Sequence, residues 1–193
     1  ETENVPSFSD TPIISLSAPP MREILAEINQ ASNNLYAEAL GKILARRLNL
    51  ESPTEAIAHY LQKIGIDPKE YVLVDASGLS RQNLIAPQTL VKILQLMARS
   101  PNSEIAQAYR QSLARPGASG TLKRRFSNTQ IQNNLWGKTG TLTGVGALSG
   151  YLNTSSGLPL VFSIIVNNSE LKSRNLRSAI DEIVTIVNYL ERC

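Results

Sequence analysis

Cysteine and histidine are almost absent from this chain of 193 residues, which has one of each. The cysteine is Cys193, the last residue, so no disulfide can form within the chain. The histidine, His59, lies opposite the apolar stripe of a predicted helix, so we expect it to be solvated. A histidine-based metal cluster is excluded, and we predict neither a metal ion nor a cofactor.

Aromatic residues and long apolar runs are also scarce. Aromatics make up 5% of the chain, and no apolar run reaches the roughly 20 residues needed to span a membrane. The net charge is only +3, and the densest basic cluster, Lys123-Arg124-Arg125, has no interleaved aromatics. We interpret this cluster as a solvated helix face and predict no nucleic-acid partner. The length suits one domain.

Hydrophobic periodicity divides the remainder into helices followed by strands. Residues 1–20 are rich in proline, serine and threonine and predict an extended segment, with room for a short strand at Ile13–Ser17. Helical spacing predicts helices at 21–31, 35–48, 53–65, 87–99 and 102–113 and a long helix that closes the chain. Strands are predicted at 134–142, 145–153 and 158–167. The expected fold class is α+β, a helical cluster with a three-stranded antiparallel meander and a terminal helix.

The most informative segment lies in the first predicted strand, where Lys138, Thr139 and Gly140 form a Lys-Thr-Gly triplet followed by Thr141. A cation and hydroxyl groups on an extended backbone can hold a carboxylate. Glycine allows a ligand backbone to approach closely. Strict alternation puts Lys138 and Gly140 on one face of the strand, and Thr139 and Thr141 on the other.

The same residues also resemble the end of a Walker A phosphate loop. That motif requires a glycine five positions before Gly137, where this chain has Gln132. A phosphate loop also opens a helix, whereas the residues after Thr141 are rich in glycine. We therefore reject the phosphate-loop interpretation.

A Ser-x-Asn pattern occurs three times, beginning at Ser32, Ser100 and Ser173. Helix capping is an adequate explanation for any of them, because serine and asparagine are favoured at helix N-termini. Ser32 differs in its setting, since it lies in the break between two predicted amphipathic helices, far upstream of the Lys-Thr-Gly strand. We keep both a capping role and a catalytic role open for Ser32 and Asn34.

Taken together, three segments resemble the D-alanyl-D-alanine carboxypeptidase/endopeptidase family of low-molecular-weight penicillin-binding proteins, in order and spacing, from about Ser17 to the end of the chain. They are Ala31–Glu38 around Ser32-x-Asn34, Asp75–Pro87 with its Asp-x-Ser-Gly-Leu-Ser stretch, and Gly137–Leu142 with Gly144-Val145. Lys-Thr-Gly is one of the three motifs of penicillin-binding proteins and serine β-lactamases. Gly120-Thr121-Leu122 also matches, although Ser119 stands where the family often has aspartate.

The resemblance implies roles for these residues. Ser32 would relay a proton, and Asn34 would hold the substrate amide. Lys138 would supply positive potential, and the hydroxyls of Thr139 and Thr141 would take the terminal carboxylate beside Gly140. The backbone N–H of Thr141 would be one of two oxyanion donors. The implied substrate is a peptidoglycan stem peptide ending in D-Ala-D-Ala, β-lactams are the implied inhibitors, and the implied location is periplasmic or extracytoplasmic.

The family's attacking serine stands in a Ser-x-x-Lys motif before these segments. The only such match here is Ser169–Lys172, which follows the last strand and is interpreted as a loop leading into the terminal helix. The resemblance therefore implies that 21–193 is the C-terminal part of a catalytic domain, inactive without an upstream half. A non-catalytic module that binds peptidoglycan peptides or β-lactams is the alternative, and remnants of the fold without function are a third.

The predicted strand 158–167 is apolar on both faces, which is typical of a strand covered on both sides. In the family it would pair with a strand from the upstream half. Without that neighbour it would be an apolar edge strand, which promotes pairing between chains. We expect the chain alone to be poorly stable or to self-associate through this edge.

Overall fold

The computed structural model describes residues 17–191. Most of the predicted extended segment and of the predicted strand at Ile13–Ser17 lies outside the described residues, as does Cys193. Five helices precede the large sheet and a sixth follows it: α1 (Met21–Gln30), α2 (Asn34–Leu48), α3 (Pro53–Lys63), α4 (Pro87–Ala98), α5 (Ser103–Ser112) and α6 (Ser173–Val187). No helix within 17–191 is long and apolar enough to cross a membrane.

The large sheet contains β3 (Leu135–Leu142), β4 (Val145–Asn153) and β5 (Pro159–Val166), in the order β3-β4-β5 with antiparallel neighbours. All three strands fall within one residue of their predicted bounds, so the meander and the α+β class are confirmed. A two-stranded sheet pairs β1 (Tyr71–Val72) with β2 (Leu84–Ile85). Two short 3₁₀ helices, η1 (Pro68–Glu70) and η2 (Gly120–Leu122), complete the elements.

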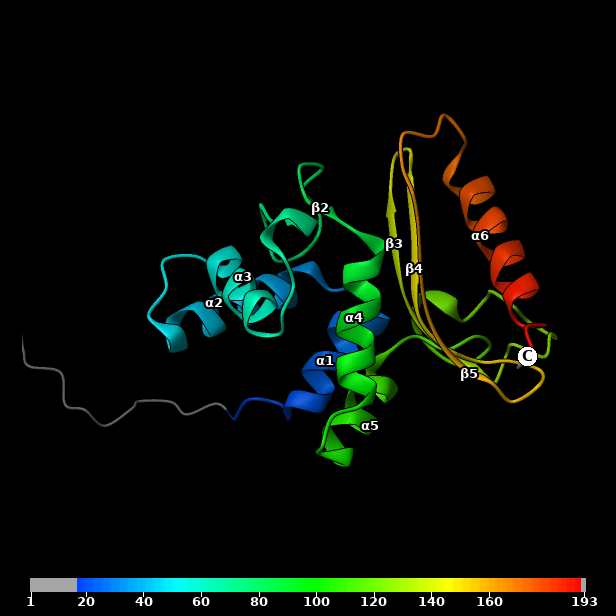
Figure 1. Cartoon of the computed structure of the whole chain (residues 1–193), viewed down its shortest axis with the longest axis horizontal. Coiled ribbons are helices and arrows are strands. Elements are labelled where there is room, and N and C mark those ends of the chain that lie inside the picture. Colours follow the sequence, from blue (N-terminus) through cyan, green and yellow to red (C-terminus); the bar gives the residue numbers. More distant parts are fainter. Residues whose placement is uncertain (1–16, 192–193) are drawn as a thin grey trace, which may run out of the picture.

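The sheet separates α1–α5 from α6 (Figure 1). On the α6 side, Leu148 and Leu152 of β4 pack with Ile180 and Val184, and Leu160, Phe162 and Ile164 of β5 extend this core. On the other side, Leu94 of α4 packs with Tyr151 and Val161. The strand β5 is therefore covered on both faces, as its sequence predicts.

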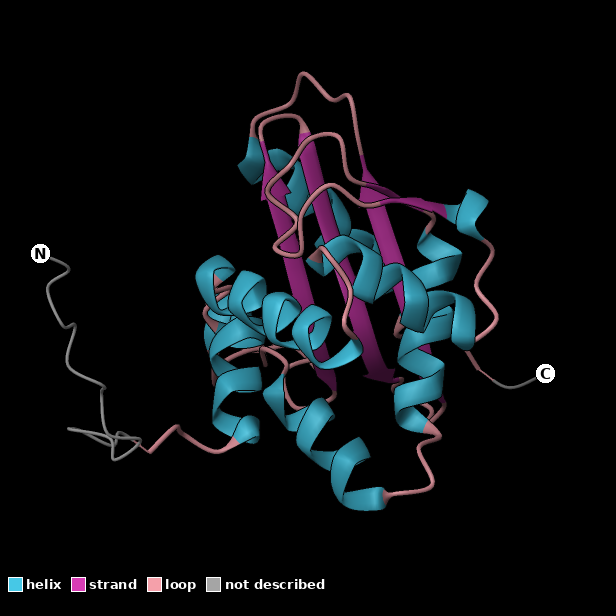
Figure 2. Cartoon of the chain, turned by 90° about the vertical axis from the view of Figure 1, so that its left-hand side faces the viewer, coloured by secondary structure: helices cyan, strands magenta, loops and turns pink. Residues whose placement is uncertain are grey.

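Figure 2 shows the helices of the α4 side in front of the large sheet, and within this group α3 packs along α2 and α1 contacts α2. This group presents the α1–α2 turn to β3. His59 of α3 is exposed, which confirms the prediction of a solvated side chain. The arrangement places Ser32 on the face of the sheet from which the Lys138 side chain projects.

Candidate active site

The turn between α1 and α2 displays Ser32 in an unusual backbone conformation. Its φ of 57° lies in the left-handed region, which few residues other than glycine adopt. The neighbouring Asn33 caps α2, since its side chain accepts a hydrogen bond from the Tyr36 N–H at 3.1 Å and donates one to Glu27 at 3.1 Å. Because Asn33 makes the cap, the hydroxyl of Ser32 is free for another contact.

That contact is with Lys138. The ammonium group of Lys138 donates to Ser32 Oγ at 2.8 Å and to the Thr139 carbonyl oxygen at 2.9 Å. No carboxylate within residues 17–191 forms a salt bridge with Lys138. Burial lowers the pKa of the Lys138 amine below its ordinary value, because removal from water disfavours the charged form. The pair is thus a hydroxyl joined to an amine that gives up its proton more readily than an exposed lysine.

The outer edge of β3 is open beside this pair. Gly137 exchanges two backbone hydrogen bonds with Ala114, at 2.9 and 3.0 Å, on the side away from β4. Backbone groups of an antiparallel strand alternate in direction, so those of Thr139 and Thr141 also face away from β4. Among residues 17–191 no backbone group pairs with them there, and the one side-chain contact is that of Lys138 with the Thr139 carbonyl oxygen. The N–H of Thr141 is therefore available to a ligand that lies along the strand.

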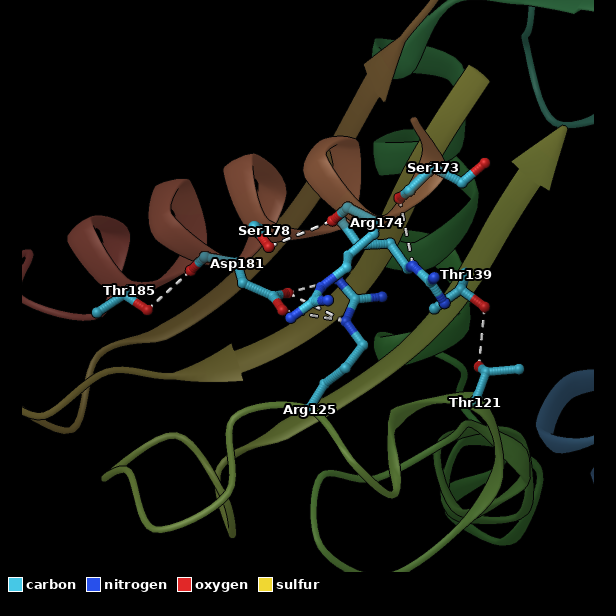
Figure 3. Close-up of polar contacts among 9 residues, drawn as sticks. Thr121, Arg125, Thr139, Ser173, Arg174, Ser178, Asp181 and Thr185 are labelled. Atoms are coloured by element: carbon cyan, nitrogen blue, oxygen red, sulfur yellow. Dashed lines mark hydrogen bonds and ion pairs between the residues drawn. The ribbon is translucent and has the colours of Figure 1, made fainter. Parts of the chain in front are cut away.

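The two threonines differ in their surroundings. The hydroxyl of Thr139 donates to Thr121 Oγ1 of η2 at 2.8 Å, as Figure 3 shows, whereas Thr141 is exposed. Gly140, between them, is also exposed, and a Cβ there would meet only Ala147 Cβ, at 3.4 Å. Packing does not require glycine at position 140, and a side chain there would project from the same face of the strand as Lys138.

A cleft of about 750 Å³ opens beside the strand and is lined in part by Lys138, Thr139 and Gly140. Ser32 reaches this site through its bond with Lys138. Asn34 is the first residue of α2 and is half-buried, but it does not line the cleft. Ser32 and Thr141 do not line the cleft either. Of the predicted site residues, the structure thus joins Ser32 to Lys138 and places Lys138, Thr139 and Gly140 along the cleft.

The loop after β1 forms the opposite wall of the cleft and is held by two carboxylates. Asp75 accepts hydrogen bonds from the Gly78 and Ser80 N–H groups, each at 2.6 Å, and from Asn83 at 2.9 Å. Burial by itself raises the pKa of Asp75, but these hydrogen bonds together outweigh burial and the pKa is lowered. Glu38 of α2 accepts two further backbone N–H bonds from this loop, at 2.9 and 2.8 Å.

Sequence reasoning assigned no role to Glu38, Arg81 or Thr121. Glu38 ties the loop to α2, and Arg81 donates to the Thr143 carbonyl oxygen at 3.0 Å, which links the loop to the β3–β4 turn. These contacts join segments distant in the chain, so local spacing contains no signal for them. Only the place of the three residues inside or beside the matched motifs could have pointed to them.

The Ser169–Lys172 match lies in the loop between β5 and α6. The Ser169 N–H donates to the Gly144 carbonyl oxygen at 3.1 Å, and its hydroxyl accepts from the Leu171 N–H at 3.2 Å. Lys172 precedes the first residue of α6, so the serine does not begin a helix with this lysine one turn later. The prediction of a connecting loop is confirmed.

The rejection of the phosphate-loop interpretation is also confirmed, because 137–142 lies in strand β3 and does not open a helix.

Comparison with known proteins finds relatives over most of this chain. A carboxypeptidase DacB from Mycolicibacterium smegmatis is 31% identical over 185 residues, which cover 92% of this chain and 39% of that protein. A penicillin-sensitive carboxypeptidase A from Dictyostelium discoideum is 33% identical over 180 residues, which cover 88% of this chain and 34% of that protein. The chain thus spans little more than a third of the length of these relatives.

Solved structures give the same result. The crystal structure of penicillin binding protein 4 (dacB) from Haemophilus influenzae matches with a TM-score of 0.76 and 26% identity, covering 89% of this chain and 40% of that chain. A class A β-lactamase from Bacteroides cellulosilyticus, at 18% identity and a TM-score of 0.66, shares the fold over 87% of this chain and 62% of its own. The model of the D-Ala-D-Ala carboxypeptidase 3 (S13) family matches residues 2–187. This chain belongs to that family.

Proposed function

We propose that this chain forms the substrate-binding and proton-relay side of a serine D-Ala-D-Ala carboxypeptidase/endopeptidase site. The observation that carries the proposal is the 2.8 Å hydrogen bond from Lys138 to Ser32, next to the open edge of β3. Family membership supports it, because relatives carry carboxypeptidase names. The proposed substrate is a peptidoglycan stem peptide that ends in D-Ala-D-Ala.

The proposed chemistry follows from the groups at this edge. The terminal carboxylate of the peptide lies against the hydroxyls of Thr139 and Thr141, within the positive potential of Lys138. The scissile carbonyl oxygen accepts from the Thr141 N–H, which stabilises the oxyanion that forms when the carbonyl is attacked. Asn34, the first residue of α2, holds the substrate amide.

Ser32 and Lys138 act as the proton relay. When the peptide bond breaks, the departing amine takes a proton from the Ser32 hydroxyl, and Lys138 replaces that proton through the existing hydrogen bond. The lowered pKa of Lys138 favours this transfer, since the donor gives up its proton more easily than an exposed lysine. A water that later hydrolyses the acyl-enzyme delivers its proton by the reverse route.

The attacking serine in this proposal comes from outside residues 17–191, because none of the serines there begins a helix with lysine three positions later. It belongs to a segment that packs against the cleft beside Lys138 and supplies the second oxyanion N–H. Until that segment is present, the chain binds but does not cleave. Action on peptidoglycan places the enzyme in the periplasm or another extracytoplasmic compartment.

Labelling with a fluorescent penicillin tests the proposal in the longest protein that contains this chain. We expect a covalent adduct that is lost when a serine in an upstream Ser-x-x-Lys is changed, and that forms much more slowly in Ser32→Ala and Lys138→Met variants. Ser100→Ala is the matched control, because it alters a second Ser-x-Asn whose serine makes no hydrogen bond with Lys138. Its labelling rate should equal that of the wild type.

Other outcomes separate the alternatives. Penicillin that binds reversibly without an adduct, in a protein with no upstream Ser-x-x-Lys, would favour a non-catalytic β-lactam or peptide-binding module. A covalent adduct on Ser169 would overturn the assignment of the attacking serine. No binding of any kind would leave only the shared fold.

A further inference from the structure

A second cavity, of about 460 Å³, lies between η2 and the first turns of α6. We call it the basic pocket. Its lining is composed mostly of cationic side chains and comprises Gly120, Thr121, Lys123, Arg124, Arg125, Arg174, Arg177, Ser178 and Asp181. The prediction of a solvated helix face at Lys123–Arg125 is wrong, because these residues lie in turns after η2. In the fold, α6 adds Arg174 and Arg177 to the same cavity.

The charges in the basic pocket are unbalanced. Asp181 is its single carboxylate, and Arg125 pairs with it through Nη2 at 2.5 Å and Nε at 3.1 Å (Figure 3). That pair is neutral as a whole. Four cationic side chains remain, Lys123, Arg124, Arg174 and Arg177, and none has a salt bridge within residues 17–191. Like charges gathered in one cavity repel each other, so a bound anion would lower the energy of the group.

The start of α6 adds to this positive potential. The helix begins at Ser173 with no side-chain cap and no acidic residue in its first turn. Its first N–H groups carry partial positive charge, which favours an anion nearby. The arginines of α6 are exposed and can turn toward a ligand without disturbing the core.

One hydroxyl pair connects the basic pocket with the candidate active site. Thr121 lines the basic pocket, Thr139 lines the active-site cleft, and their hydroxyls are 2.8 Å apart. If the terminal carboxylate of a ligand lies on Thr139 and Thr141, a short side chain on the same residue of the ligand is long enough to enter the basic pocket. The group that does so is on the leaving side of the scissile bond.

We propose that the basic pocket is a subsite for a second carboxylate, carried by the part of the peptide that leaves when the scissile bond breaks. Arginine matches the planar geometry of a carboxylate through paired N–H groups. The inference rests on the proposed function, because Thr139 and Thr141 define which end of the peptide lies nearest. The subsite would make the enzyme prefer peptides in which the residue released by cleavage has an anionic side chain.

Calorimetric titration of the full chain with two peptides tests this subsite. Both are N-acetylated and end in a D-residue after D-Ala: D-Glu in one and D-Gln in the other. The pair has the same shape and terminal carboxylate and differs only in the side-chain charge. We expect the D-Glu peptide to bind about three- to tenfold more tightly, a difference that shrinks as salt increases.

Charge-reversal variants test whether the arginines of α6 cause the preference for the D-Glu peptide. In Arg174→Glu/Arg177→Glu this preference should vanish or invert, whereas Arg174→Lys/Arg177→Lys should keep most of it. Arg46→Glu/Arg47→Glu is the control for overall charge, since these exposed residues end α2, far from α6 (Figure 1), and the net charge changes equally. This control should keep the full preference. Thermal melts establish that each variant is folded.

Two results overturn the subsite: equal affinity of the wild type for both peptides, or a preference that persists in Arg174→Glu/Arg177→Glu. If neither peptide binds, the proposed function fails instead, and citrate then decides whether the pocket binds carboxylates. Saturable NMR shifts of the Arg174 and Arg177 Nε–H signals on adding citrate would support a carboxylate site there. Unchanged signals would overturn it.

Discussion

The Lys138 ammonium group donates to Ser32 Oγ at 2.8 Å, although 106 positions separate these residues in the chain. The bond joins the two segments that matter most for the proposed chemistry, the α1–α2 turn and the Lys-Thr-Gly strand. It also explains why Ser32 tolerates a left-handed backbone, since that conformation aims its hydroxyl at β3.

Substitution of Ser32 by alanine should lower the pKa of Lys138 further. Burial already lowers it, and the protonated amine would lose one of its two acceptors. Binding of a carboxylate ligand should then weaken at a lower pH than in the wild type, because the amine loses its charge earlier. NMR titration of the Lys138 Nζ and Cε signals measures the pKa directly. An unchanged pKa in Ser32→Ala would contradict the pairing, and Ser100→Ala should have no effect.

Gly140 and Gly150 should respond oppositely to alanine. A Cβ at Gly140 meets only Ala147 Cβ, at 3.4 Å, so Gly140→Ala should change the free energy of unfolding by less than ~1 kcal/mol. It should nevertheless weaken binding of a D-Ala-D-Ala peptide, roughly tenfold or more, because the added methyl group lies on the Lys138 face beside the open edge. Wild-type affinity in Gly140→Ala would remove this glycine from the site.

Gly150 is the matched control on the neighbouring strand. A Cβ there would lie 2.0 Å from the Trp136 carbonyl oxygen and 2.8 Å from Gly137 Cα, both of them backbone atoms that cannot move alone. Gly150→Ala should therefore lower the free energy of unfolding by about 2–4 kcal/mol. Urea unfolding of both variants gives the comparison.

Much of this fold could be predicted from the sequence, because the helices and strands are long enough to display their periods. The bounds of β3 and β4 follow from the residue pattern and the turns between them, and those of β5 from its continuous apolar run. The site was predictable where residues adjoin in the chain, as Lys138–Thr141 do. The partners of these residues were not, since the contacts Thr139–Thr121 and Glu38–Ala76 depend on how η2 and α2 pack, which no local pattern encodes.

The Asp75 carboxylate should stabilise the cleft wall in a pH-dependent manner. Its folded pKa lies below the ordinary value of about 3.9, so its contribution is complete above that value and is lost as the pH falls through the folded pKa. Asp75→Asn should therefore cost about 1–2 kcal/mol at neutral pH and much less in strong acid. Urea unfolding across this range tests the prediction. Glu182→Gln, which alters an exposed carboxylate well inside α6 and away from its first turn, is the control and should show no such trend.

The ion pair of Arg125 and Asp181 should be important for stability. The Arg125 side chain is only 12% exposed, and Asp181 supplies its carboxylate partner from α6. Removing that partner leaves a largely buried charge without compensation, so Asp181→Ala should lower the free energy of unfolding by about 2–4 kcal/mol. The neighbouring Glu182 is exposed, and Glu182→Ala should cost less than ~0.5 kcal/mol. Equal costs for the two variants would contradict this assignment.

The outer edge of β5 should mediate self-association of the chain. Within residues 17–191 nothing pairs with that edge, and an apolar edge strand is a template for another strand. The direction of its backbone groups follows from the register. Gly137 points away from β4, so Ser149, which lies opposite the next residue of β3, points toward β3. Ser163 is opposite Ser149 and therefore directs its N–H to the outer edge, whereas Ile164 directs its N–H to β4.

Proline at these two positions should therefore have different effects. Ser163→Pro removes an N–H that only a second chain could use, so it should shift sedimentation toward the monomer while the chain stays folded. Ile164→Pro removes a β4–β5 hydrogen bond and should unfold the sheet. Sedimentation velocity over a concentration series, with thermal melts of each variant, measures both effects. If the wild-type chain is a stable monomer at every concentration, β5 is not an association edge, and the two core faces suffice to hold it.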